Sequence, residues 1–121
     1  MKYSETIEFT HDFKKLLKKF SSLAEDLEVN KKYRIELFHC KGIDNRSIFE
    51  IQSAGNTVEL KFFKIKKFQC KSLKGRGAQS GIRVIYAFHP AELKVEFIEI
   101  YHKGNKPNED YERIIEYLKS H

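Results

Sequence analysis

Two lysines spaced two residues apart, Lys64 and Lys66, are the first residues of this sequence whose types and spacing could do chemistry. Alternate side chains of a β-strand share a face, so the two ammonium groups would lie side by side while Phe63 and Ile65 point into the core. Each ammonium would disfavour charge on the other, and we expect lowered lysine pKa values. Such a lysine can take up a proton as a base, or it can hold a phosphate. The alternative is an edge strand that carries lysines against aggregation.

Further basic residues follow at strand-like positions. Arg83 lies within the segment Gly-Ile-Arg-Val-Ile-Tyr, and His102 ends a later run of apolar residues. The planar guanidinium of an arginine can contact two phosphate oxygens at once. Histidine titrates near neutral pH and could act as a general acid. For both residues, the alternative is an ordinary position on the surface.

The excess positive charge of the chain is concentrated in one segment. The formal net charge is +6, yet residues 60–91 contain no Asp or Glu. A surface normally intersperses both signs, because a single-sign field repels itself. A basic face kept for solubility is one interpretation, and a site for a polyanion, most commonly nucleic acid, is the favoured one. The eight cations of the segment are Lys61, Lys64, Lys66, Lys67, Lys71, Lys74, Arg76 and Arg83.

Length and composition limit the class of protein. With 121 residues, 40% of them hydrophobic, we expect one domain spanning residues 1–121. No run approaches the roughly 20 apolar residues of a membrane span, and the N-terminus lacks a secretory signal, so a cytoplasmic location is expected. Cys40 and Cys70 are too isolated for a disulfide framework. No acidic or histidine cluster has metal-ligand spacing, and we expect no metal or other cofactor.

The N-terminal half predicts a strand followed by helices. Residues 5–9 alternate like a strand, and Thr10 is suited to cap a helix with Asp12 in its first turn. Apolar residues then recur with helical spacing from 13 to 27. Ser22, three residues before a glutamate, predicts a second helix and so a helical hairpin. Residues 33–40 have an ambiguous pattern that we interpret as a continuation of that helix.

The C-terminal half predicts a sheet and a last helix. Strands are expected at 48–51, 58–68, 82–88 and 93–101, with a glycine-bearing loop at 71–81. Asn108 is suited to cap a final helix, whose apolar stripe contains Tyr111, Ile114, Ile115 and Leu118. The predicted fold is α+β, an antiparallel sheet with the N-terminal helical hairpin and the C-terminal helix packed on one face.

This order of elements, together with the middle of the chain, resembles the RelE/ParE toxin superfamily of bacterial toxin–antitoxin systems. The resemblance rests on Phe63-Lys64-Ile65-Lys66-Lys67, then Ser80-Gly81-Ile82-Arg83-Val84-Ile85-Tyr86, and then Phe97-Ile98-Glu99-Ile100-Tyr101-His102-Lys103. It implies a microbial-RNase-like fold. It also implies messenger-RNA cleavage on the ribosome for the RelE branch, DNA gyrase poisoning for the ParE branch, and a cognate antitoxin protein as partner.

The resemblance also implies roles for particular residues. Active-site lysines of the family match Lys64 and Lys66, and a phosphate-binding arginine matches Arg83. The family often places a basic or histidine catalytic residue where His102 and Lys103 stand. A family tyrosine matches Tyr111, for which core packing is the alternative. Under the same interpretation, contacts to RNA are expected from Lys61, Lys67, Lys71, Lys74 and Arg76.

The leading hypothesis is therefore a ribosome-dependent mRNA endonuclease toxin. Cleavage without a metal needs a base for the 2′-hydroxyl proton, charge stabilisation at phosphorus, and a proton for the leaving 5′-oxygen. Attack by the neighbouring 2′-hydroxyl would leave a 2′,3′-cyclic phosphate. The alternatives are a non-catalytic, ParE-like gyrase inhibitor and an inactive binding module of RelE fold.

Overall fold

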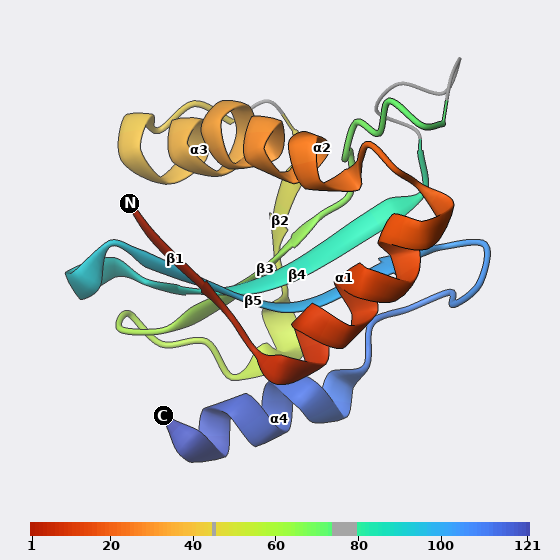
Figure 1. Cartoon of the computed structure of the whole chain (residues 1–121). Coiled ribbons are helices and arrows are strands. Elements are labelled where there is room, and N and C mark those ends of the chain that lie inside the picture. Colours follow the sequence, from red (N-terminus) through yellow and green to blue (C-terminus); the bar gives the residue numbers. More distant parts are fainter. Residues whose placement is uncertain (45, 74–79) are drawn as a thin grey trace.

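A computed structural model describes residues 1–44, 46–73 and 80–121. Those residues form a five-stranded sheet in the order β1-β5-β4-β3-β2 (Figure 1). The central strands are antiparallel, whereas β1 lies parallel to β5 at one edge, which the sequence did not predict. The strands are β1 (Lys2–Glu5), β2 (Ile48–Glu50), β3 (Lys61–Ile65), β4 (Ile82–His89) and β5 (Lys94–His102).

The first helix, α1 (Ile7–Lys19), begins four residues earlier than predicted. Thr6 caps it, because the Thr6 hydroxyl accepts a hydrogen bond from the Phe9 backbone N–H at 3.1 Å. Phe9 is fully buried and begins the apolar stripe of the helix. The predicted cap at Thr10 is therefore wrong, and the predicted strand at 5–9 is displaced to β1.

The predicted helical hairpin is present, and its second arm is longer than one helix. It consists of α2 (Leu23–Asn30), a π-helical turn (Lys31–Ile35) and α3 (Glu36–Lys41). The ambiguous segment 33–40 is thus helical, as predicted. Gly42 ends α3 with a φ of 67°, a left-handed conformation that glycine adopts without a Cβ clash.

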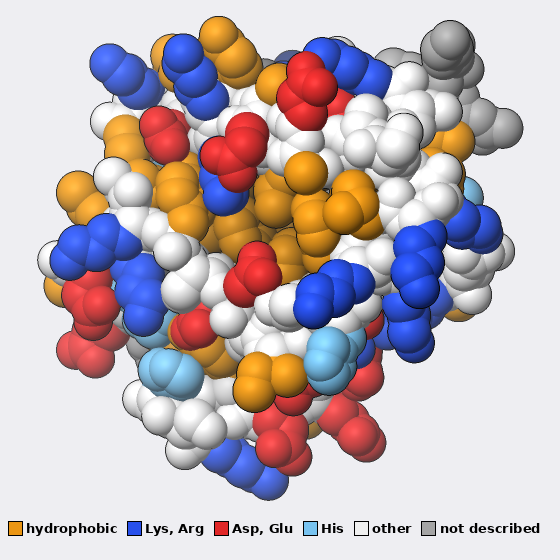
Figure 2. Space-filling model, viewed as in Figure 1, with side chains coloured by type: hydrophobic (Ala, Val, Ile, Leu, Met, Phe, Trp, Pro, Cys, Tyr) orange, Lys and Arg blue, Asp and Glu red, His pale blue; other side chains and the backbone are white. Residues whose placement is uncertain are grey.

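Helices cover both faces of the sheet, so the prediction of helices on one face is wrong. One core, which includes Phe63, Tyr86 and Phe97, lies under α1 and α2. A second core, which includes Phe62 and Ile85, lies under α4 (Tyr111–Ser120). Adjacent large apolar residues in β3 to β5 supply both faces, which a sheet exposed on one side would not tolerate. Figure 2 shows apolar side chains in the hollow between α1 and the α2–α3 layer.

Two boundaries near the predicted site also differ from expectation. Strand β3 ends at Ile65, three residues before the predicted end. The last helix begins after Asp110, whose side chain accepts from the Glu112 N–H at 3.2 Å, and not after Asn108. None of the described helices is long and apolar enough to span a membrane.

Candidate active site

The sheet register assembles the central basic residues on the face that α4 covers. Lys64 lies opposite Ile85, and Arg83 lies opposite Tyr101. Because side chains alternate along a strand, Lys64 shares its face with Phe62, and Arg83 shares its face with Ile85. Phe62 and Ile85 both belong to the core beneath α4. Lys64 and Arg83 therefore lie on the same face of the sheet.

Lys66 lies next to Arg83, immediately after β3. The Arg83 guanidinium donates to the Lys66 carbonyl at 2.7 Å, which fixes one edge of its planar group. The Lys66 ammonium lies 4.8 Å from the centre of the Phe49 ring on the neighbouring edge strand, a cation–π distance. Lys66 is exposed and Arg83 half-buried. These two cations can meet a phosphate from the solvent side.

Lys64 does not lie free beside Lys66 but forms an ion pair with Glu109, at 2.7 Å between Nζ and Oε1. The Lys64 side chain is 14% exposed and that of Glu109 is 19% exposed. Burial alone would lower the pKa of Lys64, but the carboxylate of Glu109 outweighs it, and the pKa is raised. The predicted lowering of the Lys64 pKa by Lys66 is therefore wrong. Lys64 is a held cation and not a free base.

A buried glutamate anchors the segment that carries Glu109. Glu99, in the middle of β5, is 2% exposed. Its carboxylate pairs with the Lys106 ammonium and accepts the Asp110 backbone N–H at 2.8 Å. The register of β4 and β5 shifts between Ile85 and Tyr86, directly beside Glu99, as at a β-bulge, a feature that re-aims side chains near functional sites. These contacts with Glu99 fix the connection from β5 to α4 against the sheet, and they place Glu109 next to Lys64.

Aromatic and ionic groups complete this cluster. The ammonium groups of Lys64 and Lys106 lie 5.9 Å and 5.6 Å from the centre of the Tyr101 ring. Burial raises the pKa of Tyr101, and the phenol stays neutral at physiological pH. We call Lys64, Lys66, Arg83, Glu99, Tyr101, Lys106 and Glu109 the basic-face cluster.

His102 lies on the opposite face of the sheet from this cluster. It is the next residue after Tyr101, and it packs 5.6 Å, centroid to centroid, from the Phe20 ring at the end of α1. Its Nε2 atom lies 3.2 Å from the Ser80 carbonyl. The structure thus does not bring His102 together with Lys64 and Arg83. The prediction that His102 transfers a proton there has no geometric support.

Lys103 and Tyr111 flank the connection between β5 and α4. Lys103 is exposed, and its backbone N–H donates to the Gly81 carbonyl at 2.8 Å. Tyr111 is the first residue of α4 and is 39% exposed. It follows Glu109 by two residues, on the same side of the sheet as the cluster. Its exposure does not fit the core role that the apolar stripe had suggested.

The described residues among those predicted to contact RNA lie in β3 or in the segment that follows it. Lys61 is half-buried in β3, and Lys67 is exposed. Lys71 is exposed but forms an ion pair with Glu25 of α2. Lys74 and Arg76 lie outside the described residues. Acids from elsewhere in the chain therefore neutralise part of the acid-free segment.

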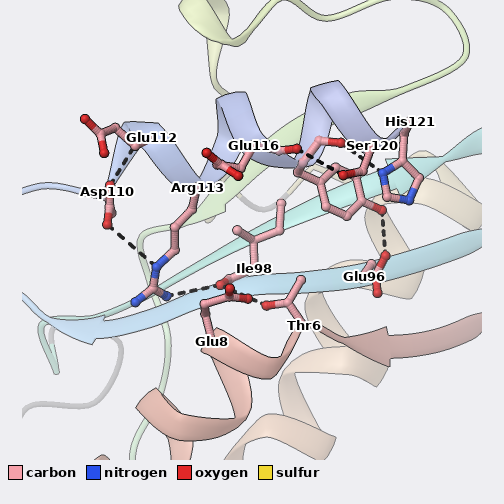
Figure 3. Close-up of a pocket in the computed structure, with 11 residues that line it drawn as sticks. Thr6, Glu8, Glu96, Ile98, Asp110, Glu112, Arg113, Glu116, Ser120 and His121 are labelled. Carbon is pink, nitrogen blue, oxygen red and sulfur yellow. Dashed lines mark hydrogen bonds and ion pairs between the residues drawn. The ribbon is translucent and has the colours of Figure 1, made fainter.

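A separate pocket of about 530 Å³ lies between α4, β5 and the start of α1 (Figure 3). Arg113 reaches from α4 towards Asp110 and the Ile98 carbonyl, and it also pairs with Asp12 at 2.5 Å. Most of the charged groups around the pocket are carboxylates, which would repel phosphate. The acidic lining residues are Glu8, Glu96, Asp110, Glu112 and Glu116.

Sequence reasoning missed Glu99, Lys106 and Glu109. A signal for Glu99 existed, because it is a charged residue within the apolar run of β5 and therefore has to be paired when buried. Glu109 carried no such signal. Its role depends on how the β5–α4 connection crosses the sheet. Among the described residues, no group of three or more His, Cys, Asp or Glu side chains is arranged to hold a metal ion.

Comparison with known proteins gives one informative match. No protein-family model and no curated protein sequence matches the chain. A chain from the crystal structure of the archaeal RelE–RelB complex of Pyrococcus horikoshii OT3 aligns with a TM-score of 0.51 and 10% identity. The alignment covers 85% of this chain and 94% of that chain. At this identity the match establishes the fold alone. The chain has a RelE-like α+β fold, as the motifs predicted.

Proposed function

We propose that this protein is the toxin of a toxin–antitoxin pair and cleaves messenger RNA on the ribosome. The observation that carries the proposal is the placement of Lys64, Lys66 and Arg83 on one face of a RelE-like sheet. Two lysine charges and one guanidinium fork suit the dispersed negative charge of a phosphorane. The gyrase and inactive-module alternatives have no need of such a cluster.

The proposed reaction uses the substrate's own nucleophile. The neighbouring 2′-hydroxyl attacks phosphorus and the 5′-oxygen leaves, which gives a 2′,3′-cyclic phosphate and a 5′-hydroxyl. Arg83 and Lys66 are placed to bind the phosphate from the solvent side, and Lys64 from within the cluster. A protein partner is part of the proposal, because the matched fold comes from a RelE–RelB complex and the resemblance implies an antitoxin.

Induced expression of the chain in a bacterial host should arrest growth, and Lys66→Ala with Arg83→Ala should relieve the arrest. The two substitutions remove the cations that would hold the phosphate from the solvent side. The measurement is growth after induction, with message integrity followed by primer extension. Lys2→Ala with Lys119→Ala removes the same charge at exposed positions away from the cluster, and this control should stay toxic.

Two results would contradict the proposal. A Lys66/Arg83 double variant that folds and remains equally toxic would show that the cluster is not the active site. Growth arrest by the wild type while messages stay intact would favour a target other than RNA.

A further inference from the structure

The cluster holds one carboxylate in contact with the cation that would bind the phosphate. Glu109 Oε1 lies 2.7 Å from Lys64 Nζ, and the Glu109 side chain is 19% exposed, so solvent and substrate can reach it. Glu99 is the other carboxylate of the cluster. It is 2% exposed, with Lys106 on one oxygen and the Asp110 N–H on the other. Glu109 is therefore the carboxylate that a substrate can reach, and Glu99 is the one that holds the β5–α4 connection in place.

Other proton acceptors are excluded by position. His102 lies on the opposite face of the sheet, against Phe20. Lys64 is engaged by Glu109, and Arg83 is never deprotonated in proteins. Tyr101 is buried and carries its own proton. Within the described part of the cluster, Glu109 is left as the group that can accept a proton at neutral pH.

We propose that Glu109 is the general base of this site, taking the proton of the 2′-hydroxyl while Lys64 and Arg83 hold the phosphate. The inference rests on the proposed function. The O2′–H bond breaks as its proton passes to a Glu109 oxygen, and the O2′–P bond forms. The P–O5′ bond then breaks, the 5′-oxygen takes a proton from water, and Glu109 returns its proton to solvent.

Substrate binding would itself strengthen this base. Burial acts to raise the pKa of Glu109, but the contact with Lys64 outweighs it and the pKa is lowered, which keeps the carboxylate ionised. A phosphate that draws Lys64 away removes the largest influence that lowers the pKa of Glu109, while burial still raises it. Glu109 becomes more basic when the substrate is in place. This order suits a group that must be ionised before binding and must accept a proton after it.

Glu109→Gln tests the proposal because it moves cleavage and binding in different directions. The amide cannot accept the proton, and single-turnover cleavage of message on programmed ribosomes should fall about 10²- to 10⁴-fold, the usual contribution of a general base. Loss of the carboxylate also frees Lys64. Affinity for message with a 2′-deoxy residue at the cut position should therefore hold or increase. Glu112→Gln, the same change at an exposed position on α4, should leave both unchanged.

The pH profile separates a base from a structural role. The wild type should lose activity as acid protonates Glu109, and this acidic limb should disappear from the residual activity of Glu109→Gln. If Glu109→Gln does not fold, Glu109→Asp is tested in its place. We expect this variant to cleave more slowly and to keep the loss of activity at acidic pH. An undiminished rate in the folded variant, or a faster one, overturns the assignment. A wild type that leaves message intact instead contradicts the proposed function.

Discussion

At the scale of single residues, the basic-face cluster contains two lysine–glutamate ion pairs that differ in burial. Glu99 is buried and its charge is offset by Lys106, so the pair fixes the β5–α4 connection to the sheet. Glu109 is more exposed and holds Lys64. The first pair positions the connection and the second lies where the substrate would bind, although both pair a lysine with a glutamate.

Lys106→Met should destabilise the protein by about 2 kcal/mol at neutral pH, because it leaves a buried carboxylate without its cation. Glu99 would keep only the Asp110 N–H. Adding Glu99→Gln should recover part of the loss, since the remaining buried group is then uncharged. Urea unfolding of the single and double variants measures both effects. Equal stability of Lys106→Met and wild type would mean that the pair does not anchor the connection.

At the scale of elements, the sequence predicts the helices and strands that are defined by a local periodicity of apolar residues. The amphipathic stripe of α1, the helical continuation into α3 and the strands β4 and β5 all depend on local spacing of apolar residues. The position of β1 could not be predicted this way, because its pairing partner, β5, follows about 90 residues later. Phe62 and Phe63 are adjacent and point to opposite faces of the sheet, so both faces must be covered by helices. A search for strict alternation of apolar and polar residues overlooks this signal.

The same division applies to the candidate site. Strand alternation predicts that Lys64 and Lys66 share a face, whereas Arg83 is assigned to the site from the family resemblance. Glu109 could not be predicted, because a loop and not a strand or helix brings it to Lys64. The sequence could not predict which face of the sheet His102 occupies. A shift of one residue in the strand register moves every side chain to the opposite face.

The attachment of α3 to the sheet should weaken in mild acid. His39 of α3 lies 2.7 Å from the buried Tyr86 hydroxyl and stacks on Phe88, and burial lowers the pKa of His39 to about 4. An unfolded histidine titrates near 6.5. Between these pH values His39 is protonated in the unfolded state but not in the folded state. The free energy of unfolding therefore falls as the pH drops from about 6.5 towards 4.

Urea midpoints at pH 7 and pH 5 measure this dependence. The wild type should lose stability between the two values, and His39→Gln should lose less, because its amide can still bond to Tyr86 but does not titrate. His11→Gln, at an exposed position, should follow the wild type. An identical pH response of His39→Gln and wild type would exclude His39 as the source.

At the scale of the whole molecule, the charge map of the sequence differs from that of the folded surface. Of the eight cations in residues 60–91, Lys64 and Lys71 are paired with acids from distant segments. Lys and Arg side chains also gather over α1 (Figure 2), on the opposite side of the sheet from the basic-face cluster. Under the proposed function, the surface available to RNA is therefore smaller than the acid-free segment suggests.

The salt dependence of RNA binding should reflect this smaller surface. Four cations of the segment lie among the described residues without an acidic partner there: Lys61, Lys66, Lys67 and Arg83. Four contacts to a single strand give a slope of about −3 in log affinity against log salt, or roughly 50-fold weaker binding at 200 mM than at 50 mM. Lys64 adds little to the net slope, because the Glu109 carboxylate remains in the site and offsets its charge when the phosphate draws Lys64 away.

Filter-binding titrations of an uncleavable RNA at several salt concentrations measure the slope. Lys66→Ala with Arg83→Ala should reduce its magnitude by about 1.4, the share of two phosphate contacts. Lys18→Ala with Lys19→Ala, on the exposed face of α1, removes equal charge and should leave the slope unchanged. An equal reduction by both pairs would mean that RNA also binds across α1. A slope near −6 would mean that all eight cations of the segment contact phosphate, including Lys71, whose ion pair with Glu25 would have to open on binding.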